Sequence, residues 1–147
     1  MALVAPSIVL LSAVACDVAG DAGGASSPAA GPNPASVGDA VLAAAFEDRT
    51  SDLEIEGVGA VERLLADDEE GSRHQRFILR LASGQTLLVA HNIDVAPRVP
   101  DLREGDEIAF RGVYEWSPQG GTIHWTHRDP SGGHASGWLR HGGRAYE

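Results

Sequence analysis

The chain has 147 residues and a formal net charge of −10, with 21 acidic residues against 11 basic ones. This length gives room for one small domain. The negative charge argues against nucleic acid and anionic lipid headgroups as partners, because the long-range electrostatic force has the wrong sign for both.

An apolar, uncharged run occupies residues 2–15. A membrane-spanning helix needs about 20 apolar residues, so this run is instead typical of a secretory signal peptide. The order Ala13-Val14-Ala15-Cys16 is similar to the lipobox of bacterial lipoproteins, in which the cysteine is acylated and becomes the mature N-terminus. We therefore expect residues 1–16 to direct export to a periplasmic or other extracytoplasmic site, with Cys16 as the lipid anchor. An ordinary signal peptide that is cleaved nearby is the alternative.

Residues 17–37 are rich in glycine, alanine, serine and proline, and they contain no aromatic residue. Such a segment cannot bury enough apolar surface to offset the entropy lost on ordering. It predicts a disordered linker, which leaves residues 38–147 as the folded domain. Cys16 is the single cysteine, so the domain has neither a disulfide nor a cysteine nucleophile.

The domain is expected to begin with a short helix over residues 38–49, with Asp39 as its N-cap. Its apolar side chains fall on one stripe at helical spacing: Val41, Leu42, Ala45 and Phe46. A strand-like run follows at residues 54–65, where Gly57 and Gly59 indicate a bend or bulge. An acidic loop covers residues 67–71.

Residues 74–82 alternate in the manner of a strand that is buried on one face. The predicted inner side chains are Gln75, Phe77, Leu79 and Leu81, and the outer ones are His74, Arg76, Ile78 and Arg80. A turn at Ser83-Gly84 predicts a hairpin with residues 85–92. Two prolines make the connection over residues 93–103 irregular. Further strands are predicted at residues 107–116 and 122–127, with a shorter piece near residues 138–139 and 144–146.

Five strands with one hairpin and one irregular crossover predict a mainly β fold, namely a small five-stranded OB-like Greek-key barrel with one short N-terminal helix. An antiparallel β-sandwich is the alternative.

Four segments resemble the bacterial family known as domain of unknown function 3465. They are GSRHQRFIL (residues 71–79), VAHNID (89–94), YEW (114–116) and IHWTH (123–127). The resemblance covers residues 57–147 and implies a small exported domain, but it implies no activity. One departure is Arg128, where the resemblance would place a second histidine after His127.

The outer face of the hairpin is the first candidate binding surface, because OB-like barrels bind ligands on this face and its neighbouring loops. Arginine and histidine side chains there suit a phosphate or carboxylate. The candidate ligand-binding residues are His74, Arg76, Arg80, His91, Asn92, Glu115, Trp116 and His124. A solvated strand face, balanced by the acidic loop, is the alternative. Trp116 can stack on a base or sugar or simply pack at the rim, and Trp125 is expected in the core.

The second candidate is a metal site near the C-terminus, formed by His127, Asp129 and His134, whose side chains are suitable zinc ligands. On a continuous strand His124 and His127 point to opposite faces, so they can meet only if the strand ends or bulges between them. No spacing matches an established zinc signature. We therefore predict no cofactor, with zinc or another divalent metal as the alternative.

The chain contains neither a glycine-rich phosphate loop nor a Gly-x-Ser-x-Gly elbow. We therefore favour a monomeric, non-catalytic module that binds a small ligand or an envelope protein outside the inner membrane. The alternative is a metal-dependent hydrolase of the phosphodiesterase or nuclease type, acting through the histidine-rich C-terminal segment.

Overall fold

The computed structural model describes residues 34–147; the expected signal peptide, Cys16 and most of the expected linker lie outside the described residues. A helix, α1 (Pro34–Glu47), is followed by strands β1 (Leu53–Leu64), β2 (His74–Arg80), β3 (Thr86–Asn92), β4 (Glu107–Glu115), β5 (Thr122–His124), β6 (Trp138–His141) and β7 (Arg144–Tyr146). No helix within residues 34–147 has both the length and the apolar character needed to cross a membrane.

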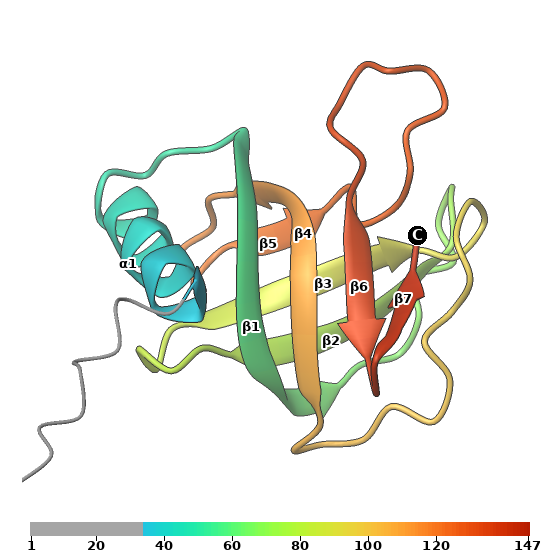
Figure 1. Ribbon diagram of the computed structural model, residues 1–147, viewed down its shortest axis with the longest axis horizontal. Coiled ribbons are helices and arrows are strands. Elements are labelled where there is room, and N and C mark those ends of the chain that lie inside the picture. The colour runs from blue at the N-terminus through green and yellow to red at the C-terminus, as the bar shows by residue number, and fades with distance from the viewer. Residues whose placement is uncertain (1–33) are drawn as a thin grey trace, which may run out of the picture.

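Strands β1 to β5 form a closed barrel (Figure 1). Strand β1 pairs antiparallel with β4 and with β2, and β2 pairs antiparallel with β3. Strand β5 closes the ring, because it pairs parallel with β3 and antiparallel with β4. This mixed five-stranded arrangement confirms the predicted OB-like barrel and differs from an antiparallel sandwich. The β6–β7 hairpin extends the sheet beyond β4.

The long strand β1 pairs with β4 through residues 53–60 and with β2 through residues 60–64, and its register against β2 shifts between Val61 and Arg63. Its glycines, which precede this shift, allow close packing against neighbouring strands. A Cβ atom on Gly57 would lie 2.6 Å from the Phe110 ring, and one on Gly59 would lie 2.9 Å from the Arg80 carbonyl oxygen. The irregularity predicted at the glycines is therefore displaced toward the end of the strand, while the glycines themselves make room for the core and for β2.

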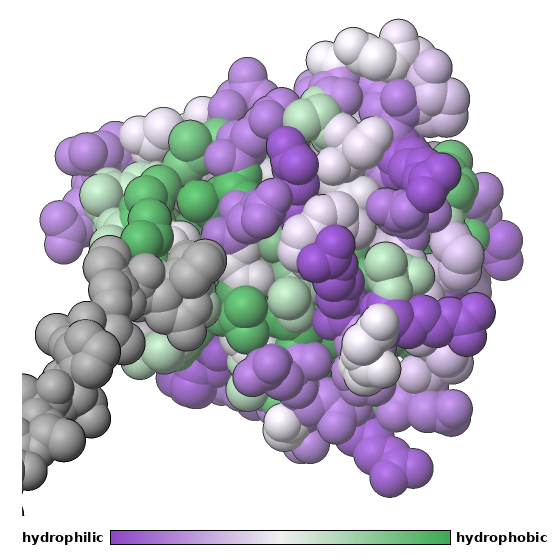
Figure 2. Space-filling model, viewed as in Figure 1, coloured by the Kyte–Doolittle hydropathy of each residue, from purple (hydrophilic) through white to green (hydrophobic). Residues whose placement is uncertain are grey.

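The core fills the barrel with aliphatic and aromatic side chains from all five barrel strands and from β6. Its fully buried members include Phe77, Leu79, Leu87, Val89, Ile108, Phe110, Tyr114, Ile123 and Leu139. The predicted alternation of β2 is confirmed, since Gln75, Phe77 and Leu79 are all buried. On the face shown in Figure 2, apolar surface gathers over α1.

The helix differs in detail from the predicted one. It begins at Pro34, within the segment expected to be a linker, because proline is well tolerated in the first turn of a helix. Asp39 consequently lies inside the helix instead of capping it, and its carboxylate accepts a hydrogen bond of 3.0 Å from the Ser83 amide. Leu42 and Ala45 are buried as predicted, whereas Val41 remains exposed.

Strand β5 is shorter than predicted and ends at His124. The next residue, Trp125, has a φ of 55°, which turns the chain out of the sheet. In Figure 1 the segment between β5 and β6 projects beyond the barrel. The Gly137 amide donates a hydrogen bond of 2.9 Å to the His127 carbonyl and so closes the base of this projection.

Candidate functional site

A pocket of about 480 Å³ lies on the outer surface where β3, the end of β5 and the following loop meet. We call it the histidine pocket; its lining residues are His74, Ala90, Asn92, Val95, His124, Trp125 and His127. It brings together three of the predicted ligand-binding residues and one of the predicted metal ligands.

The sheet register explains why these side chains meet. His74 on β2 is paired with Asn92 on β3, so both belong to the same outer row. Val89 on β3 is paired with Ile123 on β5, which places the next residue of β5, His124, beside Ala90 on the outer surface. His127 reaches the same pocket because β5 ends before it. The strand therefore ends between His124 and His127, which is the condition under which the sequence allowed these two residues to share a site.

Trp125 forms a wall of the histidine pocket in a strained backbone conformation. Its ring centroid lies 4.2 Å from that of His134, 5.4 Å from that of His127 and 6.2 Å from that of His124. A positive φ in a bulky non-glycine residue costs about 1–3 kcal/mol, and such strain clusters at functional sites. The expectation that Trp125 lies in the core is wrong: it is only half-buried, because the chain leaves the strand at this residue.

His124 has an unsatisfied nitrogen at the edge of the pocket. Its Nε2 atom is buried and forms no hydrogen bond, and the Glu115 carboxylate lies 3.7 Å away, beyond hydrogen-bond distance. Burial lowers the pKa of His124 from its usual value, while the negative charges of Glu115 and Asp52 partly oppose this shift. The predicted residue Glu115 thus stands beside His124 and is not among the residues that line the pocket.

His91 lies inside the barrel and not on the predicted ligand surface, because side chains alternate along β3 and its neighbour Asn92 points outward. Its Nε2 atom lies 3.0 Å from the Pro97 carbonyl oxygen, which can only accept, so Nε2 carries the proton. Its Nδ1 atom therefore accepts from the Thr126 hydroxyl at 2.8 Å. Burial also lowers the pKa of His91, and we conclude that this residue supports the pocket from behind.

The segment that follows β3 is fixed by local hydrogen bonds. The Asn92 side-chain oxygen accepts from the Asp94 amide at 3.0 Å. The Asp94 carboxylate in turn accepts from the backbone amide and from Nε of Arg73, both at 2.8 Å, and these bonds lower the pKa of Asp94. They connect the β1–β2 loop to the segment that carries Val95, and thereby hold one wall of the histidine pocket in place.

The predicted metal ligands do not converge. The Asp129 carboxylate accepts hydrogen bonds from the amide and hydroxyl of Ser131 and from the His134 amide, which keep its pKa well below the usual range. His134 stacks on Trp125, and the ring of His127 donates through Nδ1 to the Arg128 carbonyl. Nowhere in residues 34–147 do three or more His, Cys, Asp or Glu side chains form an arrangement that could hold a metal ion. We therefore derive no metal chemistry from this segment.

Three other predicted ligand residues lie outside the histidine pocket. Arg80 forms an ion pair of 2.7 Å with Glu62, and Arg76 donates through Nε to the Ala66 carbonyl. Trp116 packs against Phe46 of the helix, with ring centroids 6.3 Å apart, and donates through its indole nitrogen to the Phe46 carbonyl. The rim-packing interpretation of Trp116 is the one that this geometry supports.

Sequence reasoning missed three lining residues: Ala90, Val95 and Trp125. For Ala90 the signal lay in the β3 alternation, since it shares a face with Asn92. Nothing in the sequence around Val95 indicates a site, and the role of Trp125 depends on a backbone angle that strand alternation hides.

Comparison with curated proteins gives no match. A family model described as "Protein of unknown function (DUF3465)" matches residues 27–147, which include the whole barrel and the histidine pocket. The chain therefore belongs to the DUF3465 family of proteins of unknown function.

Proposed function

We propose that this domain is a binding module that holds a small, planar organic ligand in the histidine pocket. The observation that carries the proposal is Trp125, which is kept in a strained conformation as a pocket wall among histidine rings. Binding sites for small molecules are mostly apolar and contain a few placed polar groups. This pocket combines one indole, three imidazoles, one amide and two aliphatic side chains in that way.

A planar ligand suits the chemistry of these walls. Aromatic rings favour offset or tilted contacts with other rings, and imidazole and amide groups offer neutral donors and acceptors. The lining residues, all within residues 34–147, carry no carboxylate and no arginine. A cationic ligand would lose hydration there without gaining a carboxylate partner.

The same lining favours binding over catalysis. Among its seven side chains, all within residues 34–147, none has a hydroxyl, thiol or carboxylate group, so the three imidazoles are the remaining nucleophile candidates. His124 also lacks a hydrogen bond to Glu115 that would orient it as a general base. These features support a module that captures its ligand and releases it unchanged.

The direct test is a titration of the full chain with neutral aromatic fragments, namely indole, nicotinamide and p-cresol, followed by NMR. Binding should shift the amide signals of His74, Asn92 and His127. Asparagine tolerates a positive φ better than most residues, so Trp125→Asn removes the ring with little backbone strain and should weaken binding at least tenfold. The matched control is Trp116→Phe, which changes a ring outside the pocket and should bind normally. Absence of shifts with all three fragments, or equal binding by Trp125→Asn, would disprove the proposal.

We further propose that the domain works outside the inner membrane and is anchored through an acylated Cys16. The uncharged apolar run before this cysteine supports export. Metabolic labelling with an alkyne fatty acid should label the wild-type chain and leave Cys16→Ser unlabelled. A mature N-terminus beyond residue 16 would contradict the anchor.

A further inference from the structure

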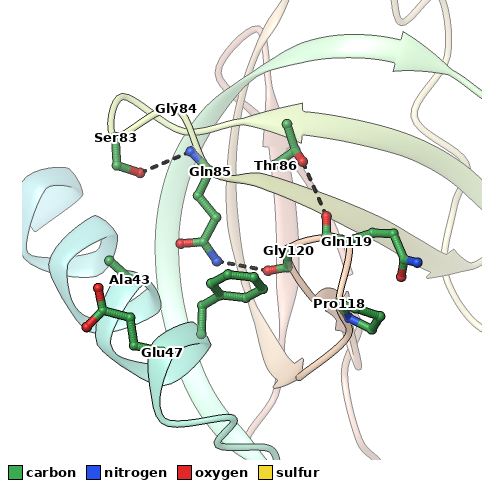
Figure 3. Close-up of a pocket in the computed structure, with 10 residues that line it drawn as sticks. Ala43, Glu47, Ser83, Gly84, Gln85, Thr86, Pro118, Gln119 and Gly120 are labelled. Atoms are coloured by element: carbon green, nitrogen blue, oxygen red, sulfur yellow. Dashed lines mark hydrogen bonds between the residues drawn. The ribbon is translucent and has the colours of Figure 1, made fainter.

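A second pocket, of about 430 Å³, lies between the last turns of α1, the β2–β3 turn and the β4–β5 turn (Figure 3). We call it the helix pocket; its lining residues are Ala43, Phe46, Glu47, Ser83, Gly84, Gln85, Thr86, Pro118, Gln119 and Gly120. It shares no residue with the histidine pocket.

The walls of the helix pocket are held rigidly. The Gly120 carbonyl accepts hydrogen bonds from Nε2 of Gln85 at 2.8 Å and from the Tyr114 hydroxyl at 3.2 Å. Gly120 has a φ of 114°, and a Cβ atom there would lie 2.0 Å from the Thr86 carbonyl oxygen. Only glycine fits this close approach, so the β4–β5 turn is fixed against the start of β3.

This framework leaves hydrogen-bonding groups along the lining of the helix pocket. Because Nε2 of Gln85 is bound to Gly120, the Oε1 atom of the same amide faces the helix as an acceptor (Figure 3). The Ser83 oxygen accepts from the Gln85 amide at 3.4 Å, which leaves its hydroxyl hydrogen free to donate. The exposed carboxylate of Glu47 adds further acceptors from α1. Phe46 and Pro118 supply apolar surface.

We infer that the helix pocket binds a neutral, hydroxyl-rich ligand, namely a saccharide unit. Sugar hydroxyls both donate and accept, which matches the free atoms of Gln85, Ser83 and Glu47, and the C–H face of a sugar ring can pack against Phe46. The lining residues, all of them in the described part of the chain, include no arginine or histidine, and Glu47 would repel an anion. A cation would gain little, because one exposed carboxylate contributes only a weak ion pair in water.

The test is a titration of the ¹⁵N-labelled full chain with two neutral disaccharides, cellobiose and N,N′-diacetylchitobiose. Binding of either sugar should shift the amide signals of Gln85, Gln119 and Gly120 and the side-chain amide signals of Gln85. Ala43→Arg places a long side chain in the pocket and should weaken binding at least tenfold. The matched control is Ala44→Arg, the exposed neighbour on the same helix, which should bind as the wild type does.

A surface variant, Glu47→Gln, removes one charge without filling the pocket, so it tests the inference even if Ala43→Arg disturbs the helix. It should weaken sugar binding a few-fold and leave the circular dichroism spectrum unchanged. The inference is overturned if neither sugar shifts these signals, or if tetramethylammonium or inorganic phosphate shifts them while the sugars do not. It is also overturned if all three variants bind the sugars as tightly as the wild type does.

Discussion

The imidazole of His91 and the hydroxyl of Thr126 share a hydrogen bond of 2.8 Å inside the barrel. Through its other nitrogen, His91 donates to the Pro97 carbonyl, so one buried side chain joins β3, the segment after β3 and the segment after β5. Two of the segments that resemble the DUF3465 family, residues 89–94 and 123–127, are therefore connected through the interior of the barrel. This link supports the walls of the histidine pocket from below.

The first prediction concerns pH. Burial lowers the pKa values of both His91 and His124 in the folded state. In the unfolded chain a histidine titrates at about pH 6.5, so below that pH the unfolded state binds more protons than the folded state. The free energy of unfolding should be largest above about pH 6.5 and should fall as the pH decreases toward the folded-state pKa values. Urea denaturation at pH 8 and at pH 5.5 measures this difference.

His91→Gln should flatten part of this pH dependence, because glutamine does not titrate. It should also lower the free energy of unfolding at pH 8 by about 1–3 kcal/mol, since one buried partner is left unpaired. Replacing His141, which lies outside the histidine pocket and 3.1 Å from Asp106, with glutamine is the control. Equal stability of the wild type at both pH values would contradict the prediction.

The second prediction concerns Gly137. A Cβ atom there would lie 1.9 Å from the Trp125 carbonyl oxygen and 2.7 Å from that of Arg111. Gly137→Ala should therefore destabilise the fold by about 1–3 kcal/mol through overpacking and should shift the indole N–H signal of Trp125. In Gly133→Ala the nearest atom would be 3.4 Å away, so this control should change stability by less than about 0.5 kcal/mol. An unchanged thermal unfolding midpoint for Gly137→Ala would show that the backbone at Trp125 is free to move.

The third prediction concerns a buried amide. The Gln75 side chain donates to the Val99 carbonyl at 3.0 Å and accepts from the Val99 amide at 2.9 Å, which reproduces a pair of strand hydrogen bonds. Gln75→Met keeps the approximate volume but leaves both backbone groups unpaired, so it should lower the free energy of unfolding by about 1–3 kcal/mol. Gln119→Met, at an exposed position, should have little effect on stability. Urea denaturation compares the two variants.

The fourth prediction concerns the projection between β5 and β6. The Asp129 carboxylate caps this segment through bonds to Ser131 and His134. Asp129→Ala should speed hydrogen exchange of the Ser131 and His134 amides and change the fluorescence of Trp125, on which His134 stacks. Glu104→Ala, at an exposed turn elsewhere, is the control. Unaltered exchange in Asp129→Ala would mean that other contacts are sufficient to order the segment.

The barrel was predictable because its signals are local. Alternation over residues 74–80 and the tight turn at Ser83-Gly84 determine a hairpin without knowledge of the rest of the chain. The same alternation, applied to residues 86–92, would have placed His91 inside once Asn92 was placed outside. The buried position of His91 could thus have been predicted from the sequence, although His91 was predicted to bind a ligand.

The histidine pocket was less predictable because it depends on long-range placement. Strand alternation separates His124 from His127, and only the positive φ of Trp125 brings both to one pocket. The proposed metal set failed for a related reason: Asp129 has the right chemistry, but its oxygens are used by the amides of its own loop. Val95 lines the histidine pocket because the ion pair between Arg73 and Asp94 holds its segment in place, and these two residues are far apart in the sequence.

The double pairing of β1 has a consequence for association between copies of this protein. The barrel closes on itself through the β1–β4 pairing. Among the strands in residues 34–147, β7 therefore ends the sheet order and has a partner on one side only. It is only three residues long and begins with a charged, exposed Arg144. Natural proteins use short, charged edges to discourage edge-to-edge pairing. Copies held at high local density on a surface would therefore find little open backbone on which to extend a shared sheet.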